Sequence, residues 1–271
     1  MITSATSLYC VLGSPISHSK GPVIHNAAFA AHGIDAVYLA FEPPDAAAAV
    51  KAVKALGILG ASVTIPFKEK IMPLLDRIHP DARAMKAVNT LVLEDGRLVG
   101  YNTDWQAAVA PLLDFGIAGK TVCIAGAGGA ARAVAYGISQ HGGKIIITNR
   151  TARRGEDLAA RFNGSFVPLD QAAAIRADII INTTSLGMAP ETQVLSFPKE
   201  PLEKGMVVMD VVYTPVNTTL LKTARARGCH IVDGLAMFLT QAAAQFELWT
   251  GIRPDQNTMR KSLLHPSGAE P

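Results

Sequence analysis

The chain has 271 residues and a formal net charge of +3, and its 49% hydrophobic and 17% charged residues are the balance of a globular protein. This length allows about two domains, each with a sizeable core. Because no cluster of Lys and Arg stands out, we do not expect nucleic acid as a partner, although a cationic pocket for an anionic ligand fits the mild positive charge.

The N-terminal part of the chain alternates predicted strands with predicted helices. Short apolar runs that end at Gly or Pro predict buried strands, and a Pro or Asp before an apolar periodic run predicts a helix start. The predicted strands are 8–12, 37–41, 60–65, 88–93 and 98–101, and the predicted helices are 22–32 and 46–56. This alternation is typical of an open α/β sheet.

A second series of strands and helices follows. The predicted strands are 121–125, 145–148, 179–182 and 207–211, with helical segments between them. A helix over 105–115 precedes them, and a helix over 235–251 and a shorter one near 255–264 follow. The sequence therefore predicts two α/β domains with a helical tail.

The strongest motif joins a predicted strand to a predicted helix. Gly126-Ala127-Gly128-Gly129-Ala130-Ala131 has the pattern G-x-G-x-x-A. The first glycine permits a tight turn, the second lets the backbone approach a pyrophosphate, and the small last residue lets the helix pack closely on the strand. The helix start then offers free N–H groups to the phosphates. The motif predicts dinucleotide binding.

The next predicted strand indicates which dinucleotide binds. An NAD site usually has an Asp or Glu after this strand, to hold the ribose 2′-OH. Here the residues are Asn149-Arg150-Thr151, followed by Arg153 and Arg154. A guanidinium and hydrogen-bonding side chains suit a 2′-phosphate, so we expect NADP. The alternative is a solvated basic start of a helix.

Cysteines and hydropathy bear on the compartment. Cys10, Cys123 and Cys229 are odd in number and form no C-x-x-C pair, so neither a disulfide framework nor a zinc site is expected. Cys10 and Cys123 lie in apolar runs and are expected to be small buried side chains. No cluster has metal-ligand spacing, and no apolar run reaches the roughly 18 residues of a membrane span. We expect a cytoplasmic protein with no metal and no membrane contact.

Several polar residues lie at the ends of predicted strands, where open α/β sheets bind ligands. Lys68 follows a strand and a proline, Asn89 opens another strand, and Asp104 ends the first domain. Taken singly each is ordinary, because a strand-end lysine is usually solvated and Asp104 is a good cap for the helix over 105–115.

Together these residues resemble one family, the shikimate dehydrogenases. The matching segments, in order, are GSPISHSKGP, ASVTIPFKEK, AVNTL, NTD, GAGGAARA, NRT, INTTSLGM, DVVYTP and VDGLAMFLTQAAAQFELWTG. The resemblance implies an α/β protein with an N-terminal open α/β substrate domain, residues 1–104 with 238–271, and a Rossmann-type NADP-binding domain, residues 105–237. It implies reversible reduction of 3-dehydroshikimate to shikimate, within aromatic amino-acid biosynthesis.

The resemblance also assigns roles to residues. Lys68 and Asp104 match the catalytic pair, with Lys68 as the base and Asp104 orienting it. The positions that match substrate contacts are Ser19, Gly21, Ser62, Thr64, Asn89, Tyr213 and Gln241. The residues expected at NADP are Gly126, Ala127, Gly128, Gly129, Ala130, Asn149, Arg150, Thr151, Arg154, Thr183, Ser185, Met188, Gly234 and Met237.

Four residues depart from the family pattern. Gly21 replaces a carboxylate-binding serine, Ser62 a substrate-binding asparagine, and Trp105 and Ala236 two glycines. A lost hydrogen bond to a charged group weakens binding by about 1.5–3 kcal/mol. Compensation by neighbours is one interpretation. A preference for quinate or another related ring hydroxy acid is a second, and a non-catalytic NADPH-binding regulator is a third. The sequence leaves a monomer and a homodimer equally open.

Overall fold

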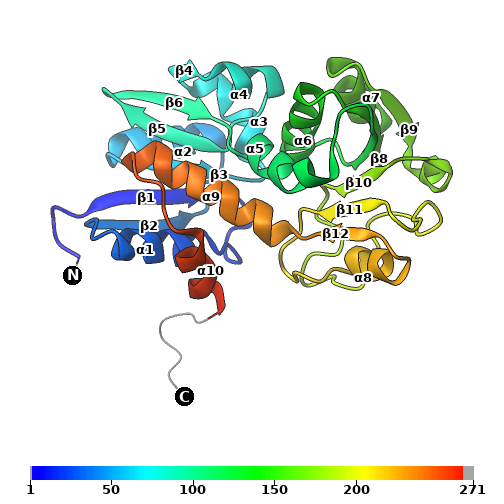
Figure 1. Ribbon diagram of the computed structural model, residues 1–271. Helices are drawn as coiled ribbons and strands as arrows, with labels where there is room; N and C mark the ends of the chain where they lie inside the picture. The colour runs from blue at the N-terminus through cyan, green and yellow to red at the C-terminus, as the bar shows by residue number, and fades with distance from the viewer. Residues whose placement is uncertain (1, 265–271) are drawn as a thin grey trace. The chain divides into compact units, whose positions relative to one another are not determined.

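The computed structural model describes residues 2–264 (Figure 1). The chain divides into two compact units. The first contains the residues up to Thr103 together with those from Leu239 onward, and the second is Asp104–Phe238. The second division point falls inside helix α9 (Gly234–Thr250), which therefore contributes residues to both units.

The first unit is built on a six-stranded sheet. Its strands are β1 (Ser7–Leu12), β2 (Ala36–Phe41), β3 (Gly60–Val63), β4 (Arg77–Ile78), β5 (Thr90–Glu94) and β6 (Arg97–Tyr101). The order is β2-β1-β3-β5-β6-β4, with β5 antiparallel to β3 and β6 and all other neighbours parallel. The expected open α/β sheet is confirmed.

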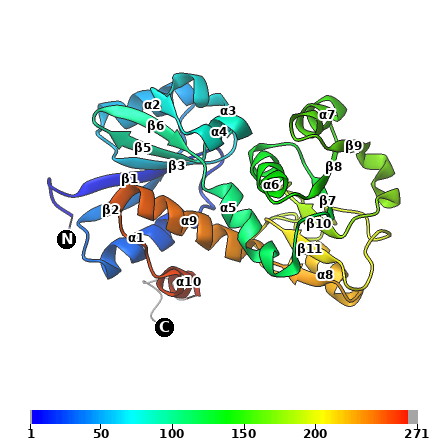
Figure 2. The same cartoon turned by 45° about the horizontal axis from the view of Figure 1, so that its top comes forward.

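Helices cover both faces of this sheet. They are α1 (Gly21–Ala31), α2 (Ala46–Ala55), α3 (Phe67–Lys70), the 3-10 turn η1 (Met72–Leu74), α4 (Pro80–Met85), the end of α9, and α10 (Gln256–Leu264). Figures 1 and 2 show α2 on one face and α1 with α9 on the other. Because side chains alternate along a strand, β1 sends Cys10 towards α2 and Tyr9 towards Phe29 and Trp249 on the other face.

Local chemistry sets the ends of these elements. The Asp that precedes the predicted helix 46–56 is Asp45, and it caps α2, because its carboxylate accepts a hydrogen bond of 2.7 Å from the Ala48 N–H. The strand expected over 60–65 ends earlier, at Val63. Thr64 instead closes a turn, since its carbonyl accepts from the Phe67 N–H at 2.8 Å, and Pro66 between them has no N–H for a sheet ladder.

The second unit has a parallel six-stranded sheet. Its strands are β7 (Thr121–Ala125), β8 (Lys144–Asn149), β9 (Ser165–Pro168), β10 (Ile179–Asn182), β11 (Val207–Asp210) and β12 (His230–Val232). The order β12-β11-β10-β7-β8-β9 is the doubly wound arrangement of dinucleotide-binding folds. The Rossmann-type expectation is confirmed, although the two edge strands β9 and β12 were not predicted.

Helices pack on both faces of the second sheet as well. They are α5 (Asp104–Val109), the 3-10 segment η2 (Ala110–Phe115), α6 (Gly129–Gln140), α7 (Ala152–Arg161), the 3-10 segment η3 (Leu169–Ala174) and α8 (Thr219–Ala226). The single helix expected over 105–115 is wrong in its second half. Pro111 lacks the N–H that an α-helix needs there, and the chain tightens to a 3-10 helix.

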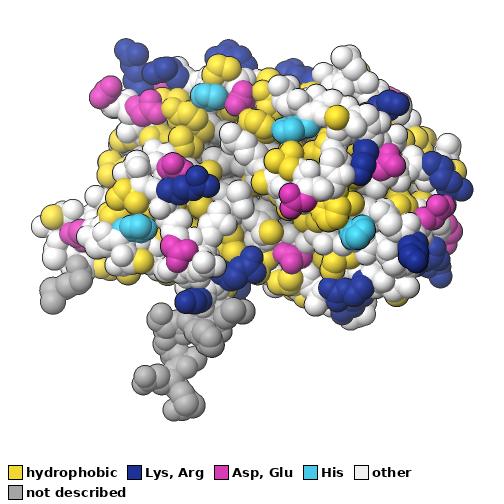
Figure 3. Space-filling model, in the orientation of Figure 1, with side chains coloured by type: hydrophobic (Ala, Val, Ile, Leu, Met, Phe, Trp, Pro, Cys, Tyr) yellow, Lys and Arg dark blue, Asp and Glu magenta, His cyan; other side chains and the backbone are white. Residues whose placement is uncertain are grey.

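Burial and surface features complete the description. Cys10 and Cys123 are fully buried as expected, and burial raises the pKa of each thiol to about 12. Within residues 2–264, no helix is both long and apolar enough to span a membrane. On the face drawn in Figure 3, basic and acidic side chains are interspersed.

Candidate active site

The glycine turn at the end of β7 has the geometry that phosphate binding requires. Gly126 has φ +119°, which disfavours any side chain, and a Cβ there would lie 2.4 Å from Thr183 Oγ1. Above Gly128, by contrast, a Cβ would meet nothing within 4 Å. Gly128 is the N-cap of α6 and supplies no side-chain acceptor to the first-turn N–H groups. The turn therefore offers open space and backbone donors together, which fits a pyrophosphate.

The carboxyl end of the neighbouring strand β8 carries cationic side chains. Asn149 ends β8, and its amide donates a hydrogen bond of 2.9 Å to the Thr151 carbonyl. Arg150, Arg153 and Arg154 are exposed at this edge. Residues 149–154 contain no acid. This composition fits a 2′-phosphate better than a ribose diol.

A loop after β10 lies against the glycine turn. Thr183 Oγ1 donates to the Ala125 carbonyl at 2.6 Å, just before Gly126. Asn182 Oδ1 accepts from the N–H of Thr184 at 3.1 Å and from its hydroxyl at 2.7 Å. The loop that contains Thr183, Ser185 and Met188 is therefore held by its own first residues.

A buried carboxylate anchors this loop. Asp210 has no exposed surface and accepts three hydrogen bonds, from Asn182 Nδ2 at 2.8 Å, the Val212 N–H at 3.0 Å and Thr218 Oγ1 at 2.7 Å. Burial raises the pKa of Asp210, and these hydrogen bonds partly oppose that rise. One side chain thus joins the loops that follow β10 and β11.

Tyr213 and the start of α9 lie in the same unit. The Tyr213 ring stacks on Phe238 with centroids 4.3 Å apart, and burial raises the pKa of its hydroxyl. The backbone of Val211 lies close to position 234 and requires a glycine there, because a Cβ would lie 2.5 Å from the Val211 carbonyl oxygen. Met237 is buried three residues further on. These residues meet beside the loop that follows β11.

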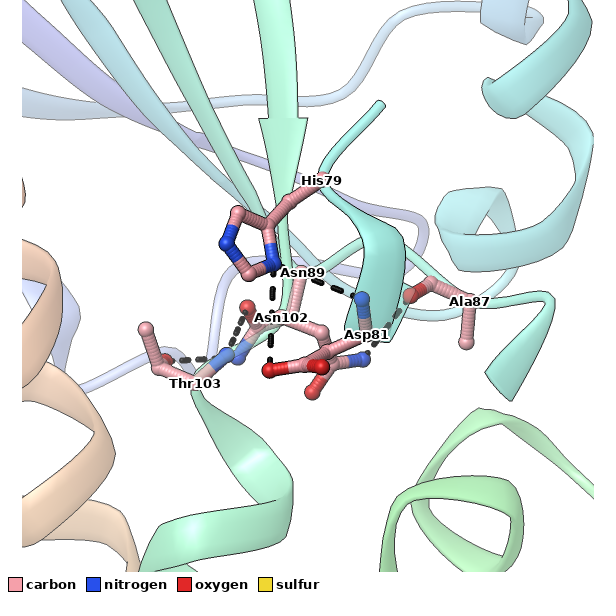
Figure 4. Close-up of polar contacts among 6 residues, drawn as sticks. All are labelled: His79, Asp81, Ala87, Asn89, Asn102 and Thr103. Atoms are coloured by element: carbon pink, nitrogen blue, oxygen red, sulfur yellow. Dashed lines mark hydrogen bonds and ion pairs between the residues drawn. The ribbon is translucent and has the colours of Figure 1, made fainter. Parts of the chain in front are cut away.

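In the first unit, Asn89 directly precedes β5, and its side chain is held by Thr103, which follows β6 (Figure 4). Its Oδ1 accepts from the Thr103 N–H at 2.8 Å, and its Nδ2 donates to Thr103 Oγ1 at 3.0 Å. Thr103 in turn donates to the Gln241 carbonyl at 3.1 Å. Asn102 donates to the Ala87 carbonyl at 2.9 Å, which fixes the chain on both sides of this contact. The expected substrate residues Asn89 and Gln241 are thereby brought together.

Figure 4 also shows a helix start near this cluster. The Asp81 N–H donates to His79 Nδ1 at 3.4 Å, and the Asp81 carboxylate lies 3.8 Å from the same nitrogen. His79 is the N-cap of α4, so this contact has a local structural explanation.

The expected catalytic residues belong to different units. Lys68 is half-buried in the first turn of α3, and its carbonyl accepts a hydrogen bond of 2.8 Å from the Val88 N–H. Asp104 is buried and is the first residue of the second unit. Asp104 is the first helical residue of α5, so the helix begins one position earlier than a cap at Asp104 would allow.

Ser19 and Gly21, two of the expected substrate residues, lie close together at the start of α1. The Gly21 N–H donates to Ser19 Oγ at 3.2 Å. Thr64 is half-buried beside Gly13, where a Cβ would lie 2.3 Å from the Thr64 methyl. Ser62 lies on β3, two residues before Thr64, within hydrogen-bond distance of Tyr38 and Gln245.

Sequence reasoning missed four residues of these networks: Tyr38, Asn182, Asp210 and Gln245. Asn182 and Asp210 had a signal, since both are polar residues at the carboxyl ends of predicted strands. Gln245 had a weaker one, because it follows Gln241 by one helical turn and shares its face of α9. Tyr38 lies within a strand and had none.

A doubly wound sheet, a phosphate-binding glycine turn and a second α/β unit with polar strand ends define a class, the two-domain dinucleotide-dependent α/β proteins. Family models agree: one for the shikimate dehydrogenase substrate binding domain matches residues 11–91, one for shikimate / quinate 5-dehydrogenase matches 111–217, and one for the shikimate 5′-dehydrogenase C-terminal domain matches 234–264. The chain belongs to the shikimate dehydrogenase family, as the sequence motifs indicated.

Individual relatives are similar over nearly the full length. A Moorella thermoacetica protein named shikimate dehydrogenase (NADP(+)) is 44% identical, covering 99% of this chain and 96% of that protein. A crystal structure of a shikimate dehydrogenase with NADP+ has a TM-score of 0.91 at 39% identity, covering 99% of this chain and 98% of that one. The Thermus thermophilus enzyme with NADP(H) and shikimate has a TM-score of 0.86 at 33% identity, covering 95% of this chain and 98% of that one.

Proposed function

We propose that this chain is an NADP-dependent shikimate dehydrogenase, which interconverts 3-dehydroshikimate and shikimate. The observation that carries the proposal is its 44% identity, over 99% of its length, to a protein of that name. Lys68, Asp104 and Asn89 are all present at the matching motif positions, so the residues that the reaction needs have not been lost.

The second unit would hold the cofactor. The N–H groups of the turn at Gly126–Gly129 would bind the pyrophosphate, and Asn149, Arg150, Thr151 and Arg154 would bind the 2′-phosphate. The loop with Thr183, Ser185 and Met188, together with Gly234 and Met237, would hold the nicotinamide. When bound, NADP accepts the hydride in one direction and supplies it in the other.

Lys68 would move the proton. As the carbinol carbon loses its hydride, the hydroxyl proton transfers to Lys68 Nζ, and in the reverse direction Nζ returns it. A positioned base typically contributes about 10²–10⁴-fold to the rate. Asp104 orients the same hydroxyl and Lys68. Ser19, Thr64, Asn89, Tyr213 and Gln241 are the proposed substrate contacts.

A related ring acid is the second candidate. By the family pattern, Gly21 removes a hydroxyl from the carboxylate site and Ser62 replaces an amide, and both positions match substrate contacts, not cofactor contacts. Quinate is the first such acid to test, since one matching family model is named for both shikimate and quinate. A regulator that binds NADPH without turnover is the alternative from a different class.

A spectrophotometric screen at 340 nm separates these functions. NADP+ reduction is followed with shikimate, quinate and amino analogues, and NADPH binding is measured in parallel by calorimetry. Turnover with shikimate supports the proposal, and turnover confined to quinate or another acid supports the second candidate. Tight NADPH binding with no turnover on any acid leaves the regulator as the function.

The proposal extends to the setting of the enzyme. We place it in a reducing cytoplasm, because its three cysteines are free. We propose no nucleic acid partner, because the net charge is only +3 and no large cluster of Lys and Arg stands out. Monomer and homodimer remain the two proposed states, to be separated by analytical ultracentrifugation.

A further inference from the structure

Two residues that depart from the family pattern, Ser62 and Gly21, lie beside one hydroxyl group, that of Tyr38. Tyr38 Oη donates a hydrogen bond of 2.6 Å to Ser62 Oγ. A Cβ on Gly21 would lie 3.4 Å from the same hydroxyl and 3.2 Å from the Tyr38 ring. The Tyr38 backbone is fixed by both amide atoms of Asn26, at 2.8 and 2.9 Å, and its ring stacks on His25 with centroids 4.4 Å apart. Its hydroxyl therefore has a set position.

The direction of the hydrogen bonds beyond Ser62 is fixed by a backbone carbonyl. The Asn89 carbonyl can only accept, so the Gln245 atom 3.0 Å from it must be the amide nitrogen. Gln245 Nε2 also donates to Thr90 Oγ1 at 3.0 Å. Its oxygen then faces Ser62 Oγ at 2.7 Å, and the Ser62 hydroxyl must donate to it. Gln245 is buried, which makes each of these hydrogen bonds costly to lose.

This order determines what Ser62 can offer a ligand. A hydroxyl has one donor and two acceptor sites. The Ser62 donor is directed to Gln245, and one acceptor site receives the Tyr38 hydroxyl. Ser62 is half-buried and keeps one acceptor site. A carboxylate, which carries only acceptors, would be repelled there, whereas a ligand hydroxyl would donate to it.

We propose that Ser62 binds the ring acid through one of its ring hydroxyls and not through its carboxylate, and that Tyr38 and Gln245 are positioning residues that impose this polarity. The inference rests on the proposed function for its choice of ligand, a carbocyclic polyol acid. Gly21 fits the same arrangement, because it leaves the Tyr38 hydroxyl in place and adds no donor beside it.

Binding by calorimetry tests the inference without requiring turnover. Dissociation constants are measured for the whole protein and for Ser62→Ala with shikimate, its carboxamide and its three monodeoxy analogues. Ser62→Ala is expected to weaken shikimate and the carboxamide equally, by about 2- to 10-fold. It should leave one monodeoxy analogue unaffected, because that analogue lacks the hydroxyl in contact. A loss that disappears with the carboxamide but persists with every deoxy analogue would overturn the inference.

Two further variants separate positioning from general structure. Tyr38→Phe should weaken shikimate binding in the wild-type background and have no additional effect in Ser62→Ala, with kcat unchanged. Gln245→Met removes the acceptor of the Ser62 hydroxyl, which can then donate to the ligand. In this background, the loss of affinity caused by Ser62→Ala should differ between shikimate and its carboxamide. Additive losses of affinity from Tyr38→Phe and Ser62→Ala would contradict the inference that Tyr38 acts through Ser62. If no ring acid binds, the inference fails outright; if ring acids bind but the 340 nm screen shows no turnover, only the proposed function fails.

Discussion

Asn182 Nδ2 donates a hydrogen bond of 2.8 Å to the buried carboxylate of Asp210, at the carboxyl ends of adjacent strands β10 and β11. The same carboxylate holds the Val212 N–H, while Asn182 holds Thr184. This contact ties the loop that lies against the glycine turn to the loop that follows β11.

Removing this carboxylate should loosen both loops. Asp210→Ala leaves buried donors on Asn182 and Val212 without their acceptor, and we expect a loss of about 3 kcal/mol in the free energy of unfolding. The KM for NADP should rise about tenfold or more, which corresponds to about 1.4 kcal/mol. Denaturant unfolding and steady-state kinetics measure these effects.

Asp210→Asn is the matched control. Its amide oxygen can still accept from Asn182 and Val212, while its nitrogen donates to Thr218, whose hydroxyl can reverse its role. The loss of stability should therefore be clearly smaller than for Asp210→Ala. Equal losses from the two substitutions would show that the hydrogen-bond network is not what holds the loops.

His25 should make the protein sensitive to acid. It is buried, its Nδ1 has no hydrogen-bond partner among the described residues, and burial lowers its pKa from 6.5 to about 3. Between these values the unfolded chain binds the proton and the folded protein does not, so stability falls as the pH falls. The slope reaches about 1.4 kcal/mol per pH unit below 6.5.

His25→Phe keeps an aromatic ring against Tyr38 and cannot titrate. Urea unfolding between pH 4 and 7 gives the free energy of unfolding of both proteins. The slope due to His25 should be present in the wild type and absent from the variant. His32→Phe, at an exposed position, serves as the control and should retain the wild-type slope. The same slope in His25→Phe would assign the acid sensitivity to other groups.

Much of the fold was predictable because its signals are local. The run Thr121–Ala125 and the turn that follows are specified by adjacent residues, and the strand matches the prediction residue for residue. The same reasoning failed at η2, where the apolar pattern outweighed the effect of Pro111. It also missed β9 and β12, short edge strands with only a few apolar residues each.

The polar networks were harder to predict because their partners are distant in sequence. Ser62 and Gln245 are 183 residues apart, and Gln245 and Thr90 are 155 apart. No periodicity links such positions, and a buried glutamine in an apolar helix has no motif. Motifs did mark Asn89 and Gln241 by family resemblance, but the hydrogen bonds of Thr103 to both residues are apparent only in the folded structure.

Cofactor preference should depend on Arg150. Arg150→Ala removes a charged partner of the proposed 2′-phosphate, and we expect the preference for NADP over NAD to fall about tenfold or more. Ratios of kcat/KM for the two cofactors measure it. Arg161→Ala, at the other end of α7 and also exposed, should leave the ratio unchanged. An unaltered ratio in Arg150→Ala would exclude this residue from the 2′-phosphate site.

The most direct test of the proposed dehydrogenase is the effect of Lys68→Ala on shikimate oxidation and on NADP+ binding, measured on the same preparation. Lys68 lies in the first unit and the glycine turn in the second, so its loss should not disturb the turn. We predict that kcat falls by about 10²-fold or more while the dissociation constant for NADP+ is unchanged. A kcat within a few-fold of wild type would contradict the assignment of Lys68 as the base and the mechanism built on it.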